Sequence, residues 1–387
     1  MRKLGQGKAS QGRSVLMGLS LAALLMLPVS FSQAADSAPR GIADITRLLH
    51  EHKPDASRAD AARALLQRKP PEGASKRELI RFHMQAADAA EQLGLQGRML
   101  ESRRTLATIA EGEADHPELL RQLAASELQS GNYQNALRNA RASVEHRAVR
   151  GGSELLSLFN ISRIQGFIGE VAEAKASWNQ GNLVFNRIRS ASSAAPFVNS
   201  FEALRDWARA DIAIAEGKSQ EAESALRASV AAWDKAIARA VSDNDLTLRL
   251  RVENSRELSE ARLVTVLLNQ GKLFEAELIA RDLLRRTLSR VGKDSPQSAS
   301  AVLRMAQVLL AQGRFKDADT LANEAARIYG EIGGGANLML APLSLLSHSY
   351  FGREDWGNAL KQLDRMRSLI EAADDVSRRV FRGSAET

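Results

Sequence analysis

The sequence has 387 residues, of which 44% are apolar, 26% charged and 5% aromatic, and its formal net charge is +7. Ala, Leu, Arg and Glu are abundant, a composition that is typical of a soluble protein and favours helix. The chain contains no cysteine. This absence excludes disulfide bonds, thiol nucleophiles and cysteine-ligated metal sites, so the fold must be stabilised by buried helix faces.

Residues 1–34 have the pattern of a cleaved secretory signal peptide. Four basic residues precede an apolar stretch from Val15 to Val29, and small residues before Ala34 suit a signal peptidase, so we expect cleavage after Ala34. The alternative is an uncleaved anchor, but the stretch is shorter than the ~20 residues that span a bilayer. No cysteine follows it, which excludes a lipoprotein. We therefore expect a periplasmic or secreted protein with no integral membrane anchor after cleavage.

The leader also accounts for much of the net charge. It carries four Lys or Arg and no Asp or Glu, so the charge of the remaining chain falls from +7 to +3. Acidic and basic residues are interspersed along the rest of the sequence, whereas nucleic-acid binding needs a concentrated basic patch. We expect no nucleic-acid partner.

Residues 35–74 predict an N-terminal helical lead-in or cap. Two short amphipathic stretches, 42–52 and 57–68, are separated by Pro54 and followed by Pro70 and Pro71. Proline breaks helices, so each stretch predicts a short helix that ends near the next proline.

From Ser75 to about residue 373 the sequence predicts a succession of helical hairpins. In residues 296–312 the apolar side chains recur at helical spacing along one face, at Val302, Met305, Ala306, Leu309 and Leu310. Ser295 is expected to cap this helix, Pro296 to be its first residue and Gly313 to end it in the left-handed conformation. The remaining residues, 374–387, are expected to form a tail.

A short sequence motif, in which an alanine follows a glycine by five residues, recurs along this region. Its clear copies begin at Gly131, Gly169, Gly217, Gly271 and Gly313 and end at Ala136, Ala174, Ala222, Ala276 and Ala318. A weaker copy runs from Gly97 to Ser102, and the copy from Glu354 to Ala359 lacks the glycine. Copies at 34 to 54 residue intervals predict a solenoid, with the glycines as turns and the alanines where helices cross.

The repeated unit resembles the tetratricopeptide repeat, a helix pair with small residues at the crossing and an aromatic residue after the turn. In one unit the matching positions are Leu120, Leu123, Ala124, Tyr133, Ala136 and Ala140. Residues 258–372 are similar to the longer variant typified by kinesin light chains, with an Asp-x-Pro helix start and a Gly-basic-aromatic turn. The resemblance covers 75–373, least securely at 181–257, where the unit length departs from the family. It implies an all-α, right-handed superhelical solenoid of antiparallel helix pairs.

No catalytic or metal-binding motif stands out. The Gly-rich stretch from Gly5 to Ser10 lacks a preceding strand, and His50 and His52 would point apart on a helix. HExxH and Gly-x-Ser-x-Gly motifs are absent from the sequence. Trp178 and Trp356 occupy repeat core positions, which favours packing over a ligand platform. We expect no catalytic residue, no metal and no cofactor, and hence not an enzyme.

The resemblance also predicts where a partner binds. In this family the first helix of each pair lines a concave groove, and polar residues at two positions of that helix contact ligands. Carried over unit by unit, these positions hold Gln122 and Ala125, Asn160 and Arg163, Ala208 and Asp211, Arg262 and Thr265, Arg304 and Gln307, and, in the last unit, His348. The candidates for partner binding are Asn160, Arg163, Asp211, Arg262, Arg304, Gln307 and His348. The alternative is that they are merely solvated helix residues.

These observations favour a non-catalytic scaffold that binds a protein or peptide and organises an envelope or secreted complex. A second hypothesis is a regulatory array for an enzyme encoded elsewhere, since long repeats of this family often precede caspase-like CHAT peptidase domains. An enzyme of unfamiliar type is a third. The sequence does not predict the oligomeric state.

Overall fold

The computed structural model describes residues 41–51, 56–93, 95–145, 150–331 and 336–371. The expected leader (1–34) and tail (374–387) lie outside the described residues. The chain divides into two compact units, Met1–Ala43 and Asp44–Thr387. The described residues of the first unit open helix α1 (Ile42–Glu51), and the description below concerns the second unit.

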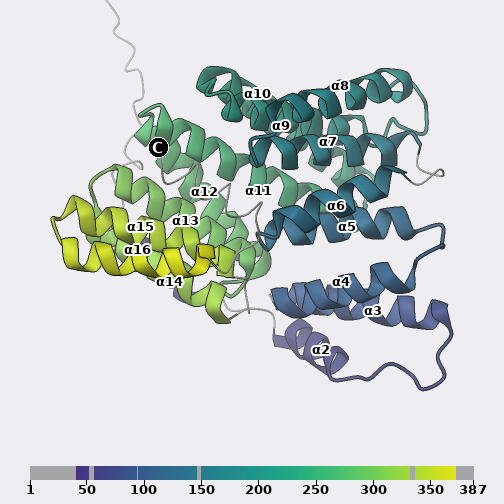
Figure 1. Cartoon of the computed structure of the whole chain (residues 1–387), viewed down its shortest axis with the longest axis horizontal. Helices are drawn as coiled ribbons and strands as arrows, with labels where there is room; N and C mark the ends of the chain where they lie inside the picture. The colour runs from purple at the N-terminus through teal and green to yellow at the C-terminus, as the bar shows by residue number, and fades with distance from the viewer. Residues whose placement is uncertain (1–40, 52–55, 94, 146–149, 332–335, 372–387) are drawn as a thin grey trace, which may run out of the picture. The chain divides into compact units, whose positions relative to one another are not determined.

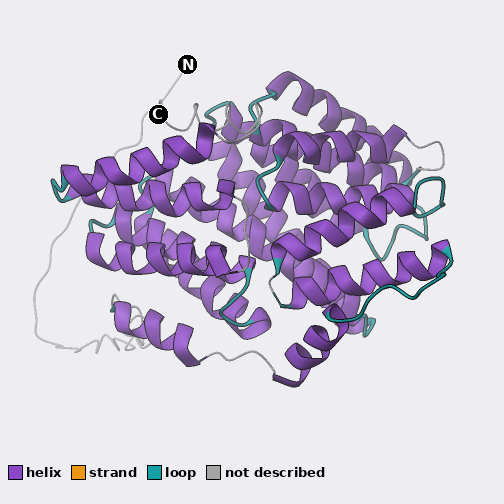
Figure 2. Cartoon of the chain, turned by 60° about the horizontal axis from the view of Figure 1, so that its bottom comes forward, coloured by secondary structure: helices purple, strands orange, loops and turns teal. Residues whose placement is uncertain are grey.

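The secondary structure of the described residues is helical, without strands (Figure 2). Helix α2 (Ala56–Leu66) is followed by antiparallel pairs that succeed one another along the chain (Figure 1). The pairs are α3 (Lys76–Gln92) with α4 (Gln96–Ile109), α5 (His116–Gln129) with α6 (Tyr133–Glu145), α7 (Gly152–Phe167) with α8 (Val171–Ile188), α9 (Val198–Ala215) with α10 (Ser219–Ser242), α11 (Leu246–Asn269) with α12 (Leu273–Val291), α13 (Pro296–Ala311) with α14 (Phe315–Glu331), and α15 (Leu340–Gly352) with α16 (Trp356–Glu371). A short 3₁₀ helix, η2 (Ala336–Met339), precedes α15. The expected all-α solenoid of helix pairs is confirmed.

The N-terminal helices lie at the two short stretches expected to be helical. Helix α2 packs against α3, and Ser75 caps α3 with its side chain, while the Glu78 carboxylate accepts a hydrogen bond from the Ser75 backbone N–H at 2.8 Å. This reciprocal capping satisfies backbone donors that the first turn leaves unpaired. The assignment of 35–74 as a separate cap stays a prediction.

Glycines form the turn inside each of the five clearest repeats. Their φ angles lie between 72° and 83°, at Gly131, Gly169, Gly217, Gly271 and Gly313. The residue after each glycine donates its N–H to the carbonyl five residues earlier, as Arg314 does to Leu309 at 2.9 Å. This bond closes a Schellman turn, which needs a left-handed residue and therefore favours glycine. The predicted role of these glycines is confirmed, as is the Ser295 cap of α13.

Alanine lies wherever the second helix of a clear repeat crosses the first. All five side chains have 0% exposure, at Ala136, Ala174, Ala222, Ala276 and Ala318. A methyl group at the crossing lets two helices approach closely, and larger side chains above and below it then fill the remaining space. The second helix is thus held against the first by the same small residue in each unit.

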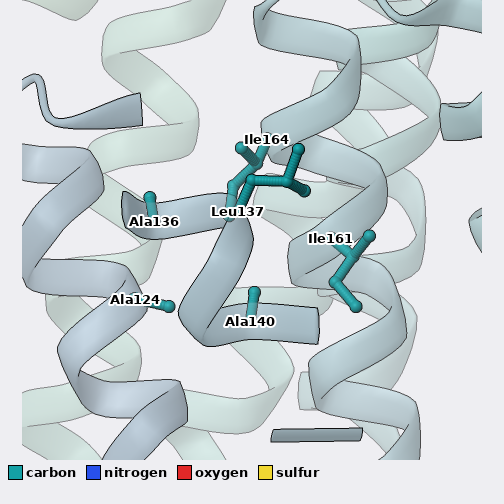
Figure 3. Packing of buried hydrophobic residues seen from close by; sticks show 6 residues of the cluster. All are labelled: Ala124, Ala136, Leu137, Ala140, Ile161 and Ile164. Atoms are coloured by element: carbon teal, nitrogen blue, oxygen red, sulfur yellow. The ribbon is translucent and has the colours of Figure 1, made fainter. Parts of the chain in front are cut away.

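Figure 3 shows one such crossing and its continuation into the next unit. Ala136 and Ala140 of α6 lie near Ala124 of α5, and Ile161 and Ile164 of α7 pack against the same buried cluster. The core is therefore continuous from one pair to the next, because α6 contributes to both.

The long intervals between repeats have two causes. Helices α10 and α11 are each 24 residues long, and Asp245 begins α11 by accepting a hydrogen bond from the Leu248 N–H at 2.9 Å. The preceding interval is lengthened by residues 189–197, which form turns between α8 and α9.

The weakest copy of the repeat was placed in the wrong register. Gly97 lies inside α4, and the turn before this helix closes with a hydrogen bond from the Leu95 N–H to the Ala90 carbonyl at 2.8 Å. In the other units, alanine lies four residues after the donor of this hydrogen bond. The residue at that position here is Met99, which is 1% exposed. Ser102 is only half-buried. Because methionine replaces the small residue here, the alanine spacing pointed to a position one helical turn too late.

Trp356 was also predicted wrongly. Its side chain is 53% exposed and meets the edge of Phe351, itself 61% exposed, with ring centroids 4.9 Å apart. Trp356 opens α16, the last described helix, so no later described helix covers it. Trp178 fits the packing prediction better, since it is half-buried and donates to the Arg205 carbonyl at 3.0 Å.

Candidate partner-binding site

The first helices of four successive pairs bring the candidate residues together. Helix α7 packs against α9, α9 against α11, and α11 against α13. We call the side that carries these candidates the first-helix face. Arg163 (α7), Arg262 (α11) and Arg304 (α13), with Asp211 (α9), form what we call the arginine cluster.

Asp211 connects two of the arginines. Its side chain is 5% exposed, and its Oδ1 accepts a hydrogen bond from Arg262 Nε at 2.9 Å. The other oxygen, Oδ2, lies 3.4 Å from Arg163 Nε. One buried carboxylate from α9 is thus shared by guanidinium groups from the helices on both sides. The contact with Arg262 is a charge-assisted hydrogen bond, which is stronger than a neutral one. Arg163 Nε is paired with Asp211 by charge, but it is buried without a hydrogen-bond partner.

A glycine on α7 allows this arrangement. A Cβ atom at Gly166 would lie 3.1 Å from the backbone carbonyl carbon of Asp211, so α7 and α9 are in backbone contact there. Gly166 is three residues after Arg163 and therefore lies on the same side of α7. A Cβ atom at position 166 would therefore require α9 to shift by a few tenths of an ångström at the residue that carries the shared carboxylate. The sequence repeat did not indicate this glycine, because it is not a turn residue.

Aromatic rings support two of the guanidinium groups. Arg163 Cζ lies 3.2 Å from the ring centroid of Trp207, which is 5% exposed, and Arg262 Cζ lies 5.2 Å from that of Phe167. The face of an aromatic ring attracts a cation and fixes the plane of a guanidinium group. Sequence reasoning missed both partnerships. The spacing of Trp207 four residues before Asp211 was a usable signal, because it places both side chains on one face of α9.

Arg304 has only neutral partners. Its Nη1 donates to Gln307 Oε1 at 2.6 Å and to Thr265 Oγ1 at 3.2 Å, and its Nε is buried without a hydrogen-bond partner. Within the described part of the chain, Arg304 forms no ion pair with a carboxylate. The expected positions Thr265, Arg304 and Gln307 are therefore in direct contact, but they leave the Arg304 charge without a counter-charge.

The pKa shifts of the arginines reflect the same excess of positive charge. Burial, together with the neighbouring charge of Arg262, lowers the pKa of Arg304 to about 10. Burial also lowers the pKa of Arg163 to about 10, where Asp211 acts against the shift and Arg262 adds to it. The cluster thus contains three guanidinium groups and one carboxylate, and the like charges oppose one another in a partly desolvated place.

The other candidates differ in their relation to the cluster. Asn160 belongs to it, since its Oδ1 lies 3.4 Å from Arg163 Nη1. His348 is exposed, and its Nδ1 lies 2.8 Å from the Ser344 carbonyl of its own helix; no contact among the described residues joins it to the cluster. Gln122 likewise bonds within its own helix, to Glu118 at 2.9 Å, and Ala208 is fully buried.

The described residues provide neither a metal site nor a membrane-spanning helix. Among residues that the structure describes, no three His, Asp or Glu side chains gather closely enough to hold a metal ion. None of the described helices combines the length and apolarity that crossing a bilayer requires.

Comparison with known proteins concerns the fold. No protein-family model matches the sequence, and no curated protein matches it. The structure is similar to that of a Rap protein in complex with competence and sporulation factor, with a TM-score of 0.54 and 10% identity over 87% of this chain and 92% of that chain. It also matches BtubC (BKLC) from P. vanneervenii, with a TM-score of 0.41 and 14% identity over 64% and 91% of the two chains. A Podosopora anserina kinesin-light-chain candidate with nearly identical TPR-like repeats gives 0.30 and 18% over 66% and 96%.

At such identities the likeness concerns the fold alone. The fold is that of a tetratricopeptide-repeat protein.

In this tetratricopeptide-repeat fold, glycines form the turns and small residues lie at the crossings of each helix pair. The first helices of successive pairs pack against one another. That adjacency is why residues about 40 to 50 positions apart in sequence, such as Arg163, Asp211 and Arg262, meet in space. The repeat architecture therefore builds the cluster, although each unit contributes only one or two of its side chains.

Proposed function

We propose that this tetratricopeptide-repeat protein is a non-catalytic scaffold that binds a protein or peptide along its first-helix face. The observation that carries the proposal is the arginine cluster, in which polar side chains of four successive first helices meet. The side chains of Arg163 and Arg262 remain 15% and 23% exposed, so they are partly accessible to a partner. Guanidinium groups suit the carbonyl and carboxylate oxygens of a polypeptide, because their N–H donors form a fixed, planar fork.

One solved structure with a similar fold, at a TM-score of 0.54, supports a polypeptide as the ligand class. That Rap protein was solved in complex with competence and sporulation factor. Repeat solenoids in general present extended surfaces assembled from equivalent helices, which suit polypeptides better than small molecules.

We further propose that the protein acts outside the cytoplasm, in the periplasm or after secretion, and organises an envelope or secreted complex there. The basis is the leader pattern of residues 1–34. Cell fractionation together with N-terminal sequencing of the native protein tests it. The expected result is a non-cytoplasmic protein that begins at Ala35. A cytoplasmic protein that retains its N-terminus contradicts the location and leaves the scaffold proposal to its own test.

Site-specific photo-crosslinking in the native host tests the binding face. One probe replaces Gln307, which is half-buried beside Arg304, and a control probe replaces Leu278, which is 59% exposed on the second helix α12. We expect the first probe to capture a defined polypeptide that the second does not. Capture by both probes equally, or by neither, contradicts the assignment of the face. A captured polypeptide that is itself an enzyme would favour the regulatory alternative over a structural complex.

A further inference from the structure

Half-buried arginines elsewhere in the chain have carboxylate partners. Pairs of this kind are Arg256 with Glu260, Arg281 with Glu277, Arg286 with Glu260, Arg290 with Glu257 and Arg353 with Asp319. Arg304 departs from this rule among the described residues, since its hydrogen bonds go to Thr265 and Gln307 only. This arginine without a carboxylate partner lies on the first-helix face, which is the face proposed to bind a polypeptide.

From this departure, and resting on the proposed function, we propose that Arg304, together with Arg262, binds a carboxylate group of the partner polypeptide. A partly desolvated cation without a counter-charge is costly in a folded protein. Such local departures from good pairing are expected where a ligand completes the arrangement. A bound carboxylate would restore the balance that Asp211 provides for Arg163 and Arg262.

The geometry leaves donors available for this ligand. Asp211 engages only Nε of Arg262, whose two terminal nitrogens have no hydrogen-bond partner among the described residues. Arg304 uses Nη1 for both of its neutral contacts, so its Nη2 has none. The Phe167 ring centroid lies 5.2 Å from Arg262 Cζ. Each of the two guanidinium groups therefore keeps a donor for a carboxylate oxygen.

A carboxylate fits the cluster better than a nucleic acid. Nucleic acids are bound by extended basic surfaces, whereas the chain beyond the leader pattern carries a formal charge of only +3. The shared chemistry is thus a carboxylate, which a polypeptide can supply from Asp or Glu side chains or from its C-terminus.

Three short peptides, measured by isothermal titration with the full-length chain, test the proposal and distinguish the two sources. The first is acetyl-Leu-Ala-Glu-Ala-Phe-amide, the second has Gln in place of Glu, and the third has Gln and a free C-terminal carboxylate. We expect at least one of the carboxylate-bearing peptides to bind about tenfold more tightly than the neutral one, as a charge-assisted hydrogen bond implies. Preference for the first indicates an acidic side chain, and preference for the third indicates a chain end.

Matched variants attribute that preference to Arg304. Arg304→Gln should abolish it, whereas Arg285→Gln, which removes the same charge from an exposed arginine of α12, should leave it unchanged. Thermal unfolding of both variants confirms that they are folded. Equal binding of all three peptides, no binding at millimolar concentration, or a preference that survives in folded Arg304→Gln overturns the proposal. If one of these results is found but the probe at position 307 still captures its partner, the scaffold function stands and only the carboxylate assignment fails.

Discussion

The unpaired charge of Arg304 should make the free protein less stable than it could be. Removing a partly buried cation that lacks a counter-charge relieves both its desolvation and its repulsion by Arg262. We expect Arg304→Gln to raise the free energy of unfolding at pH 7 by about 1 to 2 kcal/mol. Urea unfolding measures it, with Arg285→Gln as the control, which should change stability by less than about 0.5 kcal/mol. A destabilised Arg304→Gln protein would show that the charge is already compensated.

The gain in stability expected for Arg304→Gln should decrease as pH rises. Burial lowers the pKa of native Arg304 to about 10, below its value in the unfolded chain, so below pH 10 both states carry the charge and the full cost is present. As pH rises above 10, native Arg304 loses its proton before unfolded Arg304 does, and the cost disappears. Burial raises the pKa of Tyr329 to about 12 and the charge of Arg304 acts against that shift, so a comparison at pH 11 lies below the Tyr329 transition. The stability advantage of Arg304→Gln should therefore be smaller at pH 11 than at pH 7.

Glu354 occupies the turn position where five other units have glycine. Its φ angle is 61°, a left-handed conformation that costs a residue with a Cβ atom about 1 kcal/mol. We expect Glu354→Gly to stabilise the protein by about 0.5 to 1 kcal/mol, while Gly313→Ala should destabilise it by a similar amount. Thermal unfolding of the two variants measures both effects. A loss of stability in Glu354→Gly would mean that the Glu side chain contributes more than its backbone costs.

At the scale of the helix, the close contact between α7 and α9 depends on the absence of a side chain at Gly166. A Cβ at position 166 would meet the backbone of Asp211 and Ile212, which cannot move without shifting α9. We expect Gly166→Ala to destabilise the protein by about 1 to 3 kcal/mol and to weaken partner binding, because Asp211 and Arg163 would separate.

Gly330 is the matched control for this effect. It lies inside α14, where a Cβ would meet nothing within 4 Å. Gly330→Ala should therefore stabilise the protein by up to about 1 kcal/mol through helix propensity alone. Denaturant unfolding of the two variants gives both values. Similar effects of the two substitutions would exclude a specific backbone contact at Gly166.

At the scale of the whole molecule, stability is expected to vary along the array. Helix α13 buries nine residues between neighbouring helices, whereas α16 buries only Ala359. In a repeat array each unit is held by its neighbours, so a helix with fewer buried residues opens at lower cost. We expect amide hydrogens of α16 to exchange faster than those of α13 under native conditions, as measured by hydrogen exchange with mass spectrometry. Equal protection would indicate that α16 is covered in solution.

The amino-acid sequence by itself determined the helix pairs, their turns and their crossings. These features are local, because a left-handed turn selects glycine, a close crossing selects alanine and an amphipathic helix has a fixed period. The register failed only where Met99 replaced the alanine, and Trp356 was misjudged because exposure depends on whether another helix follows. The sequence also placed the candidate arginines on first helices through the family resemblance.

Only the tertiary structure decided which of those side chains meet and how their charges balance. Asp211 joins Arg163 and Arg262 across three helices, and Gly166 permits that contact, although neither relation has a signal in the spacing of the repeat. Charge balance is a property of side chains brought together from separate units, and the period of the repeat carries no information about it. The missing counter-charge at Arg304, on which the carboxylate proposal depends, is therefore visible only once the helices are packed.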